Sequence, residues 1–387
     1  MMLLRRWKVL ILTSLGVAVT LVIVLLAGGW FVSESIRAEV LECQKRDPQP
    51  DLEVIDIEEG QITLRVTPLA NDEGDWNSDG IYGLESLVGY DQVGAIRDSS
   101  DQHVVRDLVR LTGATGVGDL VRLDHFAFPG DPETAFGLRF EHVQYSSQLG
   151  DRSGWFPAWF VDGPSDRWVI LLHGRRVSPR EALRMLPIMA ELGLPSLSIT
   201  YRNDFWAPKS EDCFYRYGQT EWRDLEGAVS YAMEHGADNV VLVGYSYGGA
   251  IVTNFLYQSS LAGEVRGVIL DAPMLDLNAI IQSAAGERNI PGPFLTSAKI
   301  IARYRFDLQW GQLNYLDRTE ELAVPILLFH GDADDEVPVE TSDKLYELRP
   351  DIVTYVRVKG AGHARSWNAD RETYEAAVRD FLRTVTQ

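Results

Sequence analysis

Cysteine is scarce in this chain of 387 residues, which has only Cys43 and Cys213. Neither cysteine belongs to a C-x-x-C pair, so the sequence predicts neither a zinc site nor a redox pair. One disulfide between them would tie the segment after the N-terminal apolar run to the C-terminal half of the chain. Because a sequence does not show that two residues are close in space, two free thiols are the favoured interpretation.

Positive charge is also in deficit. The chain has 36 Lys and Arg residues against 56 Asp and Glu residues, which gives a formal net charge of −20 at pH 7. This balance argues against a nucleic-acid partner and against docking on anionic lipid headgroups. The apolar content of 45% and the charged content of 24% are typical of a globular protein with a large core.

One apolar run, Val9–Val32, is long enough to cross a bilayer, which takes about 20 residues. Arg5, Arg6 and Lys8 precede it, so the positive-inside rule places residues 1–8 in the cytoplasm and the chain after Val32 outside. A cleaved signal peptide is the competing interpretation. Its apolar region would normally have about 7–15 residues, and no A-x-A site is visible, so we favour an uncleaved anchor.

The segments after the anchor differ in character. Residues 33–50 are predicted to form a polar stalk, and residues 51–150 a small β-rich N-terminal domain. Ile62–Val66 alternates between apolar and polar residues as a half-buried strand does. Residues 151–387 are predicted to form the catalytic domain.

A tempting motif lies in the N-terminal domain, where Asp75, Asn77 and Asp79 match the first half of a calcium loop. The bidentate Glu should stand at the twelfth position, which is Ser86. An acidic surface turn is therefore favoured over a calcium site, and no metal ligand is assigned.

From Trp155 onward, short apolar runs alternate with amphipathic segments, which predicts an α/β fold with a mostly parallel sheet covered on both faces. The expected strands are 158–161, 168–172, 196–200, 240–243, 267–270, 326–329 and 354–358. The expected helices are 180–192, 221–234, 247–259, 342–348 and 371–384. The alternation lapses after Ala272, and an insertion at about 274–322 is expected to cover the strand ends as a small helical cap.

The motif that organises the catalytic domain is G-Y-S-Y-G at Gly244–Gly248, between the expected strand 240–243 and the expected helix 247–259. Strand, sharp turn and helix in this order are the context of a nucleophile elbow, which exposes a serine hydroxyl above the sheet edge. An ordinary glycine turn is the plain alternative. The motif makes Ser246 the candidate nucleophile.

A serine hydroxyl needs a base and an orienting acid, and both candidates follow later strands in the order Ser, Asp, His. His363, after a glycine-rich turn, is the candidate base. Asp334, in the loop after strand 326–329, is the candidate acid, and Asp271 at the end of the preceding strand is the alternative. The carboxyl ends of parallel strands lie on the same side of a sheet, so the loops that carry Ser246, Asp334 and His363 are expected to converge there.

The oxyanion of a tetrahedral intermediate needs N–H donors. One is expected to be the amide of Tyr247, the residue after the nucleophile. The other is expected to be the amide of Arg175, in the loop after strand 168–172. The Arg175 side chain either faces the cleft, where it would attract an anionic substrate, or is exposed to solvent.

The chain from about Trp155 to its end resembles the α/β-hydrolase superfamily, nearest to prolyl-oligopeptidase-like serine hydrolases and membrane-anchored bacterial members. The motifs that carry this resemblance are L-L-H-G at 171–174, T-Y-R-N-D at 200–204, T-E-W-R-D at 220–224, G-Y-S-Y-G-G at 244–249, L-D-A-P at 270–273, F-H-G-D-A-D at 329–334 and G-A-G-H at 360–363. The resemblance implies a serine hydrolase with a Ser-His-Asp triad and no cofactor. Arg175 departs from it, because related chains often carry an aromatic or small residue there.

Three functions follow as hypotheses. The first is an extracytoplasmic, membrane-anchored esterase, lipase or thioesterase acting on a small or lipidic acyl substrate. The second is a serine peptidase related to prolyl oligopeptidases, although about 110 N-terminal residues are too few for a propeller of at least four blades of roughly 40–50 residues. The third is a membrane-tethered binding protein with an inert hydrolase fold, because a fold alone does not guarantee activity.

Overall fold

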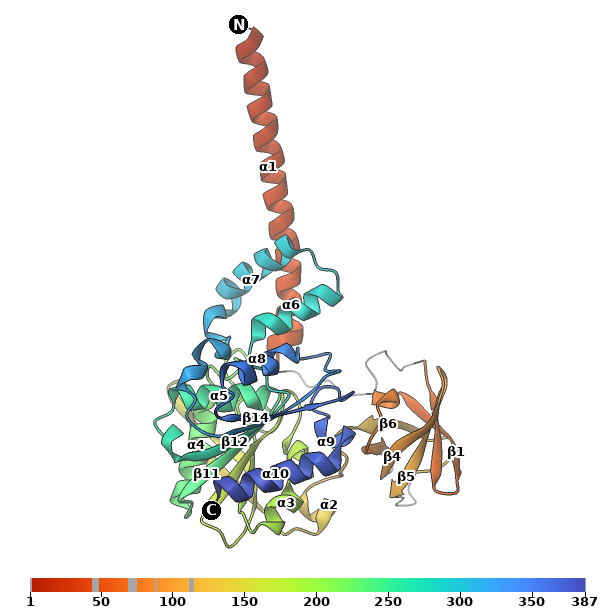
Figure 1. Cartoon of the computed structure of the whole chain (residues 1–387). Helices are drawn as coiled ribbons and strands as arrows, with labels where there is room; N and C mark the ends of the chain where they lie inside the picture. The colour runs from red at the N-terminus through yellow and green to blue at the C-terminus, as the bar shows by residue number, and fades with distance from the viewer. Residues whose placement is uncertain (1, 44–48, 69–74, 88, 111–114, 387) are drawn as a thin grey trace.

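The computed structural model describes residues 2–43, 49–68, 75–87, 89–110 and 115–386. These residues form a long N-terminal helix, a β-barrel and an α/β domain (Figure 1). The α/β fold, the additional β domain and the N-terminal apolar helix that the sequence predicts are therefore all present.

The N-terminal helix α1 spans Met2–Ser35 and continues as a short π-helical segment, η1, over Ile36–Leu41. It is the one helix among the described residues that is long and apolar enough to cross a membrane. By length and composition alone, either a membrane anchor or a signal sequence fits it. Its C-terminal part lies against the α/β domain, whereas the rest projects away (Figure 1).

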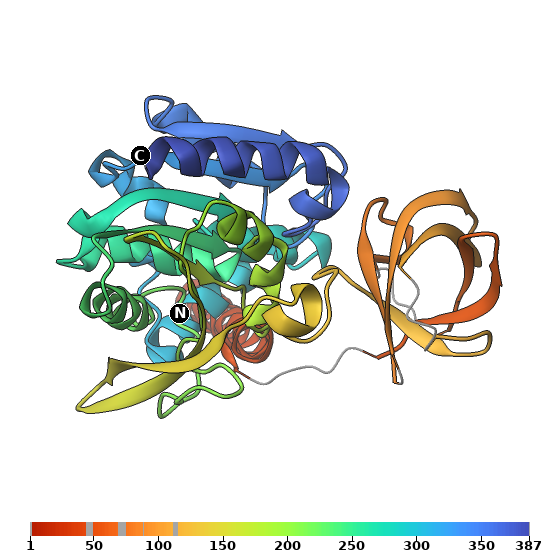
Figure 2. The same cartoon turned by 90° about the horizontal axis from the view of Figure 1, so that it is seen from below.

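The β-rich domain is a closed barrel, visible end-on in Figure 2. Its six strands, in the order β1-β2-β5-β4-β3-β6 around the barrel, are β1 (Leu52–Glu58), β2 (Gln61–Val66), β3 (Tyr82–Ser86), β4 (Tyr90–Ser99), β5 (His103–Arg110) and β6 (Leu120–Asp124). Its core is made of alternate inward-facing side chains such as Leu52, Val54 and Leu64. In the acidic turn before β3, Asp79 Oδ1 accepts hydrogen bonds from the amides of Gly80 (2.9 Å) and Ile96 (2.8 Å).

The expected domain boundary after residue 150 is wrong. Strand β7 (Glu141–Leu149) pairs along its whole length with β8 (Arg152–Val161), and this hairpin extends the sheet of the α/β domain. The boundary therefore lies between β6 and β7. The error arose because the alternating pattern of β7 looks like that of the barrel strands, whereas its partner lies later in the chain.

The α/β domain is built on an eight-stranded mixed sheet with the order β14-β13-β12-β11-β9-β10-β8-β7. Its remaining strands are β9 (Arg167–Leu172), β10 (Ser196–Ile199), β11 (Asn239–Tyr245), β12 (Val265–Asp271), β13 (Ile326–Gly331) and β14 (Val353–Val358). These six run parallel to one another, β8 runs antiparallel to them beside β10, and β7 runs antiparallel to β8 at the edge of the sheet. The central strands are buried on both faces, as their continuous apolar runs require.

Helices cover both faces of the sheet (Figures 1 and 2). The helices of the α/β domain are α2 (Pro132–Phe136), α3 (Leu186–Glu191), α4 (Trp222–Glu234), α5 (Tyr247–Gln258), α6 (Leu277–Glu287), α7 (Gly292–Phe306), α8 (Glu340–Leu348), α9 (Ser366–Ala369) and α10 (Arg371–Val385), of which α7 lies beside α1 rather than on a face of the sheet (Figure 1). The expected helix 180–192 is instead a 3₁₀ turn, η3 (Pro179–Arg184), followed by α3. Pro187 at the second residue of α3 lacks the N–H that a continuous helix would need there.

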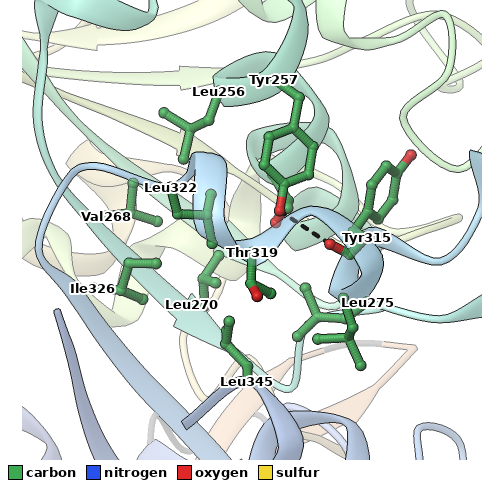
Figure 3. Close-up of a pocket in the computed structure, with 12 residues that line it drawn as sticks. Leu256, Tyr257, Val268, Leu270, Leu275, Tyr315, Thr319, Leu322, Ile326 and Leu345 are labelled. Atoms are coloured by element: carbon green, nitrogen blue, oxygen red, sulfur yellow. Dashed lines mark hydrogen bonds between the residues drawn. The ribbon is translucent and has the colours of Figure 1, made fainter. Parts of the chain in front are cut away.

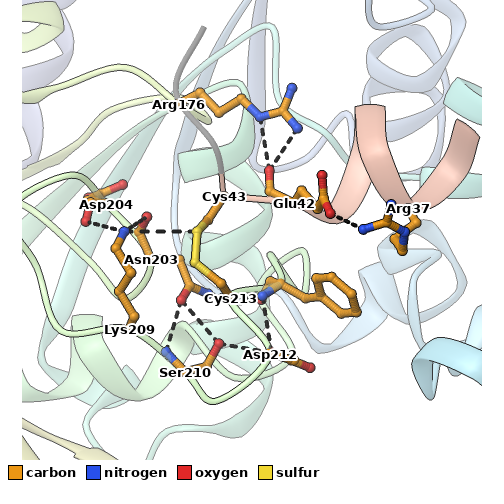
Figure 4. Close-up of a disulfide and its surroundings, with 11 residues drawn as sticks. Arg37, Glu42, Cys43, Arg176, Asn203, Asp204, Lys209, Ser210, Asp212 and Cys213 are labelled. Atoms are coloured by element: carbon orange, nitrogen blue, oxygen red, sulfur yellow. Dashed lines mark hydrogen bonds and ion pairs between the residues drawn. A yellow bond between two sulfur atoms is a disulfide. The ribbon is translucent and has the colours of Figure 1, made fainter.

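The interpretation of Cys43 and Cys213 as free thiols is wrong, because the structure joins them in a disulfide (Figure 4). The turn after η1 brings the two cysteines together. Glu42 forms a β-bridge with Phe214, and the amide of Cys43 donates to the carbonyl of Cys213 at 3.0 Å. A disulfide between residues 170 positions apart fixes the segment directly after η1 to the α/β domain.

This disulfide generates a testable prediction. A covalent link that closes so long a loop restricts the unfolded chain, so Cys213→Ser should lower the free energy of unfolding by about 2–4 kcal/mol. Thermal denaturation with and without reductant would measure the loss, and Cys43→Ser should reproduce it. Alkylation of both thiols in unreduced, folded protein would contradict the pairing.

Candidate active site

Ser246 stands in the sharp turn between β11 and α5, with backbone angles of φ 49° and ψ −112°. A left-handed φ is costly for a residue with a side chain, and it persists only where the surroundings impose it. A Cβ on Gly248 would lie 2.5 Å from the carbonyl oxygen of Leu172, and one on Gly244 would lie 2.8 Å from the backbone of Gly248. The glycines therefore allow the close approach that holds Ser246 in this turn, as the motif predicts.

The structure brings the three candidate triad residues together from three loops. His363, after β14, has its Nε2 atom 2.7 Å from Ser246 Oγ. Its Nδ1 atom lies 2.8 Å from Oδ2 of Asp334, in the loop after β13. Because an ionised carboxylate only accepts hydrogen bonds, Nδ1 donates to Asp334, and in the neutral form of His363 Nε2 is free to accept a proton from the serine hydroxyl.

Asp334 is held by more than His363. Its Oδ1 atom accepts hydrogen bonds from the amides of Glu336 (2.9 Å) and Val337 (2.8 Å). Its Oδ2 atom also lies 3.0 Å from Nε2 of the buried His330, whose Nδ1 is 2.7 Å from Ser342 Oγ. His330 is a supporting residue that the sequence reasoning missed. Its position four residues before Asp334, near the end of β13, was the available signal.

Burial and charge act against each other on the pKa values of the triad. Burial alone would raise the pKa of Asp334, but the charge of His363 and hydrogen bonds from His330 and His363 hold it well below its usual value. Burial alone would lower the pKa of His363, but the negative charges of Asp334 and Glu336 outweigh it and raise the pKa to about 9. His363 therefore favours its protonated form at neutral pH.

Asp271, the alternative acid, is placed elsewhere. Its Oδ1 atom accepts from Ser366 Oγ at 2.9 Å, and burial raises the pKa of its carboxyl to about 6. It supports the elbow through its backbone, because its carbonyl accepts the amide of Ser246 at 2.8 Å. The geometry thus favours Asp334 as the partner of His363.

The two candidate oxyanion donors flank Ser246. Tyr247 is the first residue of α5, and the amides of a first helical turn have no partner within the helix. Arg175 lies in the loop after β9, and both Arg175 and Ser246 line one cleft. The loop is held tightly at Gly174, whose amide donates to Glu181 at 2.6 Å and whose carbonyl accepts from Tyr201 at 2.7 Å.

The side chain of Arg175 is bound to the stalk. Its Nη1 atom donates to the carbonyls of Glu39 (2.6 Å) and Val40 (3.3 Å) in η1. Arg176 likewise donates to the carbonyls of Ala38 and Glu42, the latter contact being visible in Figure 4. Guanidinium groups at the C-terminal carbonyls of a helix are electrostatically favourable. The alternative in which the Arg175 side chain is exposed to solvent is therefore wrong, whereas attraction of an anionic substrate stays a prediction, because Arg175 lines the cleft.

The cleft around Ser246 has a volume of about 460 Å³, including its open mouth. Besides the predicted residues, Glu181, His125, Met274, Glu336 and Arg365 line it. His125 follows the last barrel strand, so the barrel contributes to the wall of the cleft. Glu181 and His125 were missed because nothing in their local sequence indicates proximity to Ser246.

A separate hollow lies among α5, η6 (Tyr315–Glu321) and strands β12 and β13 (Figure 3). Its lining is mostly leucine, valine and isoleucine, and the hydroxyl of Tyr257 at its edge donates to the carbonyl of Tyr315 at 3.0 Å. None of the triad residues lines it. It is an imperfection of core packing rather than a second candidate site.

Comparisons with known proteins agree with this geometry. The sequence profile described as "Alpha/beta hydrolase family" matches residues 169–377, which is more than half of the chain. The chain belongs to the α/β-hydrolase family. The matched segment contains Ser246, Asp334 and His363.

Individual relatives are distant. YqkD of Bacillus subtilis, an uncharacterized protein, is 23% identical over 218 residues, or 55% of this chain and 70% of YqkD. YfhR of Escherichia coli K12, also uncharacterized, is 25% identical over 254 residues, or 62% of this chain and 80% of YfhR.

Among solved structures, the esterase Pf2001 of Pyrococcus furiosus superposes with a TM-score of 0.53 at 20% identity, covering 67% of this chain and 96% of that one. The α/β hydrolase GrgF of Penicillium gives a TM-score of 0.50 at 16% identity, and the superposition covers 64% of this chain and 99% of GrgF. At these identities the likeness establishes the fold, and the family as a whole supports a hydrolase.

The raised pKa of His363 predicts an alkaline pH profile. A general base works in its deprotonated form, so the value of kcat/KM should rise about tenfold per pH unit below about pH 9, leaving roughly 1% of the plateau at pH 7. Ester hydrolysis measured from pH 6 to about pH 10 would test this. A profile already flat at pH 7 would contradict it.

Glu336 is one of the charges that raises the pKa of His363. Glu336→Gln should therefore move the acid limb of the profile to lower pH and increase the fraction of activity retained at pH 7. Asp335→Asn, at the neighbouring exposed carboxylate, is the matched control and should leave the limb in place. Equal shifts in both variants would mean that general surface charge, rather than Glu336, sets the pKa.

Proposed function

We propose that this protein is a membrane-anchored, extracytoplasmic serine hydrolase that cleaves carboxylic ester or thioester bonds through an acyl-enzyme. The observation that carries the proposal is the continuous line from Ser246 Oγ through His363 to Asp334, with distances of 2.7 Å and 2.8 Å. A serine hydroxyl becomes a competent nucleophile only when a base can take its proton, and this arrangement supplies that base.

The reaction follows from the hydrogen bonds. Ser246 Oγ attacks the substrate carbonyl while its proton passes to His363 Nε2, and the carbonyl π electrons move to the oxygen. The tetrahedral intermediate collapses, the C–O or C–S bond breaks, and the leaving alcohol or thiol takes the proton from His363. Water then attacks the acyl-enzyme with His363 again as base, which releases the carboxylic acid and regenerates Ser246.

Asp334 holds the imidazole in the tautomer that this cycle needs and stabilises the imidazolium that forms. Its two amide hydrogen bonds and its contact with His330 fix the carboxylate, so the orientation of His363 does not depend on substrate. The amides of Tyr247 and Arg175 are the proposed donors to the oxyanion. Removing one such donor typically costs about 10²–10³ in kcat.

Ester cleavage is favoured over peptide cleavage because of the N-terminal domain. Prolyl-oligopeptidase relatives restrict their sites with a propeller of several blades. Here the N-terminal domain is one closed six-stranded barrel, and His125, directly after its last strand, borders the cleft. No specific feature of the described residues selects an extended peptide.

Two features support the membrane location. The apolar helix α1 has basic residues before its apolar run, which favours a cytoplasmic N-terminus. The Cys43–Cys213 disulfide lies beyond that run, and disulfides persist mainly in oxidising compartments outside the cytoplasm. Both favour an anchor with the catalytic domain outside.

Covalent labelling tests the proposed nucleophile. A fluorophosphonate reacts with an activated serine because the adduct resembles the tetrahedral intermediate. One labelled site per chain is expected, and Ser246→Ala should abolish it. His363→Ala should slow labelling by about 10²–10⁴-fold, because the general base is lost. Folded wild-type protein that takes no label would point to the inert-fold hypothesis.

The two aspartates provide a matched comparison in the same assay. Asp334→Asn should slow labelling strongly, because an amide no longer holds the tautomer and charge of His363. Asp271→Asn removes a carboxylate that contacts Ser366 instead, so labelling should be largely retained. If Asp271→Asn slowed labelling more than Asp334→Asn did, the orienting role would belong to Asp271.

A further inference from the structure

A side cavity adjoins the catalytic cleft at the place where the three parts of the chain meet. Cys43 in the segment after η1, Arg122 in β6 and Tyr215 in the α/β domain all line it. The space open to the centre of a water molecule is about 330 Å³ in the side cavity and about 90 Å³ in the cleft around Ser246. The larger of the two spaces is therefore the side cavity, to which the proposed chemistry assigns no role.

Two residues line both spaces and connect the side cavity to the cleft. They are Val177, in the loop after β9, and His125, directly after the last barrel strand. A Cβ on Gly174 would lie 3.4 Å from Ser246 Cβ and 3.7 Å from Val177 Cγ2, so one backbone position touches both the nucleophile and the shared wall. A group bound in the side cavity is thus next to an ester at Ser246.

The side cavity has aromatic side chains at its mouth and apolar ones in its wall. Phe205 and Trp206, in the loop after β10, are 66% and 68% exposed, and their ring centroids lie 5.1 Å apart. Phe126 and Tyr215 are buried in the wall. Exposed apolar groups that gather around a hollow mark a binding surface, and such walls stabilise a hydrocarbon group by removing it from water.

One cation of the wall is held by uncharged groups. Lys209 lines the side cavity, and its Nζ atom donates to the carbonyls of Asn203 (3.1 Å) and Asp204 (3.2 Å). The same atom lies 3.9 Å from Cys43 Sγ (Figure 4). Carbonyl oxygens orient an ammonium but do not neutralise it, and among the described residues no carboxylate pairs with Lys209. Its charge is therefore available to an anionic ligand.

The other charged side chains limit which anion fits. Arg122 is paired with Glu85, and Arg180 lies 2.6 Å from the carboxylate of Asp124. Because Asp124 itself lines the side cavity, a multiply charged group would be repelled there. A single carboxylate, which one ammonium can bind, suits this wall better than a phosphate dianion.

We propose that the side cavity binds the acyl part of the substrate, an apolar chain that ends in a free carboxylate held by Lys209. The inference rests on the proposed function and names its substrate class, the monoesters of dicarboxylic acids. The aromatic mouth and the apolar wall hold the chain, Val177 and His125 border its passage to the cleft, and Ser246 attacks the ester at its other end.

Two esters of matched length test the carboxylate: mono-p-nitrophenyl suberate and its methyl ester, which is neutral. The wild-type protein should have the higher kcat/KM for the free acid. Lys209→Met should lower the ratio of the two values about fivefold, the upper range for an ion pair with a partly exposed ammonium. Lys209→Arg keeps the charge and should retain most of the ratio.

Lys344→Met is the matched control, because it removes the same charge from an exposed lysine on α8 that lines neither space. It should leave the ratio unchanged. A wild-type ratio near one, or equal changes in Lys209→Met and Lys344→Met, would overturn the recognition of a carboxylate by Lys209.

A filled side cavity tests the position of the chain. Ser178 lines the side cavity and is half-buried, and its hydroxyl makes no hydrogen bond to another described residue. Ser178→Phe should lower kcat/KM for mono-p-nitrophenyl suberate about tenfold or more relative to p-nitrophenyl acetate, because the ring occupies the space of several methylenes. Ser283→Phe, at an exposed serine of α6, is the control. Equal losses on both esters in Ser178→Phe, or no loss on either, would overturn the side cavity as the acyl site.

Binding can be measured apart from catalysis. Full-length Ser246→Ala protein in detergent is titrated calorimetrically with monoethyl suberate. Its affinity should fall about fivefold on adding Lys209→Met and about tenfold on adding Ser178→Phe, and it should not change on adding Lys344→Met. No binding, or equal affinities in all of these proteins, would overturn the inference whether or not the protein is an esterase. If monoethyl suberate binds as expected but the wild-type protein hydrolyses no p-nitrophenyl ester, the proposed function fails and the binding site stands.

Discussion

The loop after β9 is the constraint on which the proposed active site depends, because two different parts of the molecule hold it. Gly174 is fixed by Glu181 and Tyr201 of the α/β domain. Arg175 and Arg176 are fixed by carbonyls at the C-terminal end of η1. A donor to a developing oxyanion must be in place before the reaction, and these contacts supply that preorganisation.

It follows that the N-terminal helix is more than a tether. Its terminal carbonyls contact the loop, and Cys43 links its end to Cys213 by a disulfide. The barrel approaches the same region from another side, where Asn368, five residues after His363, donates to the carbonyls of Ile81 and His125. The three parts of the chain therefore meet near Ser246.

Local sequence patterns predicted the strands of the sheet from β8 to β14, the sharp turn at Ser246 and the proximity of Asp334 and His363 to it, because each depends on a short motif at a strand or its end. Their catalytic roles stay a prediction. The disulfide, the domain boundary before β7 and the role of Arg175 were wrong or left open. Each of these depends on contacts between residues far apart in the chain, such as Arg175 with Glu39. A local pattern of apolar and polar residues does not indicate a contact between residues so far apart in the chain.

The acyl-enzyme is the central claim, and rapid mixing with a p-nitrophenyl ester tests it most directly. The account predicts a burst of nitrophenol approaching one per chain, followed by slower turnover, with one acyl group on the peptide that contains Ser246. A p-nitroanilide with the same acyl group should react substantially more slowly. Turnover without a burst and without an acylated serine, or faster cleavage of the anilide, would contradict the account.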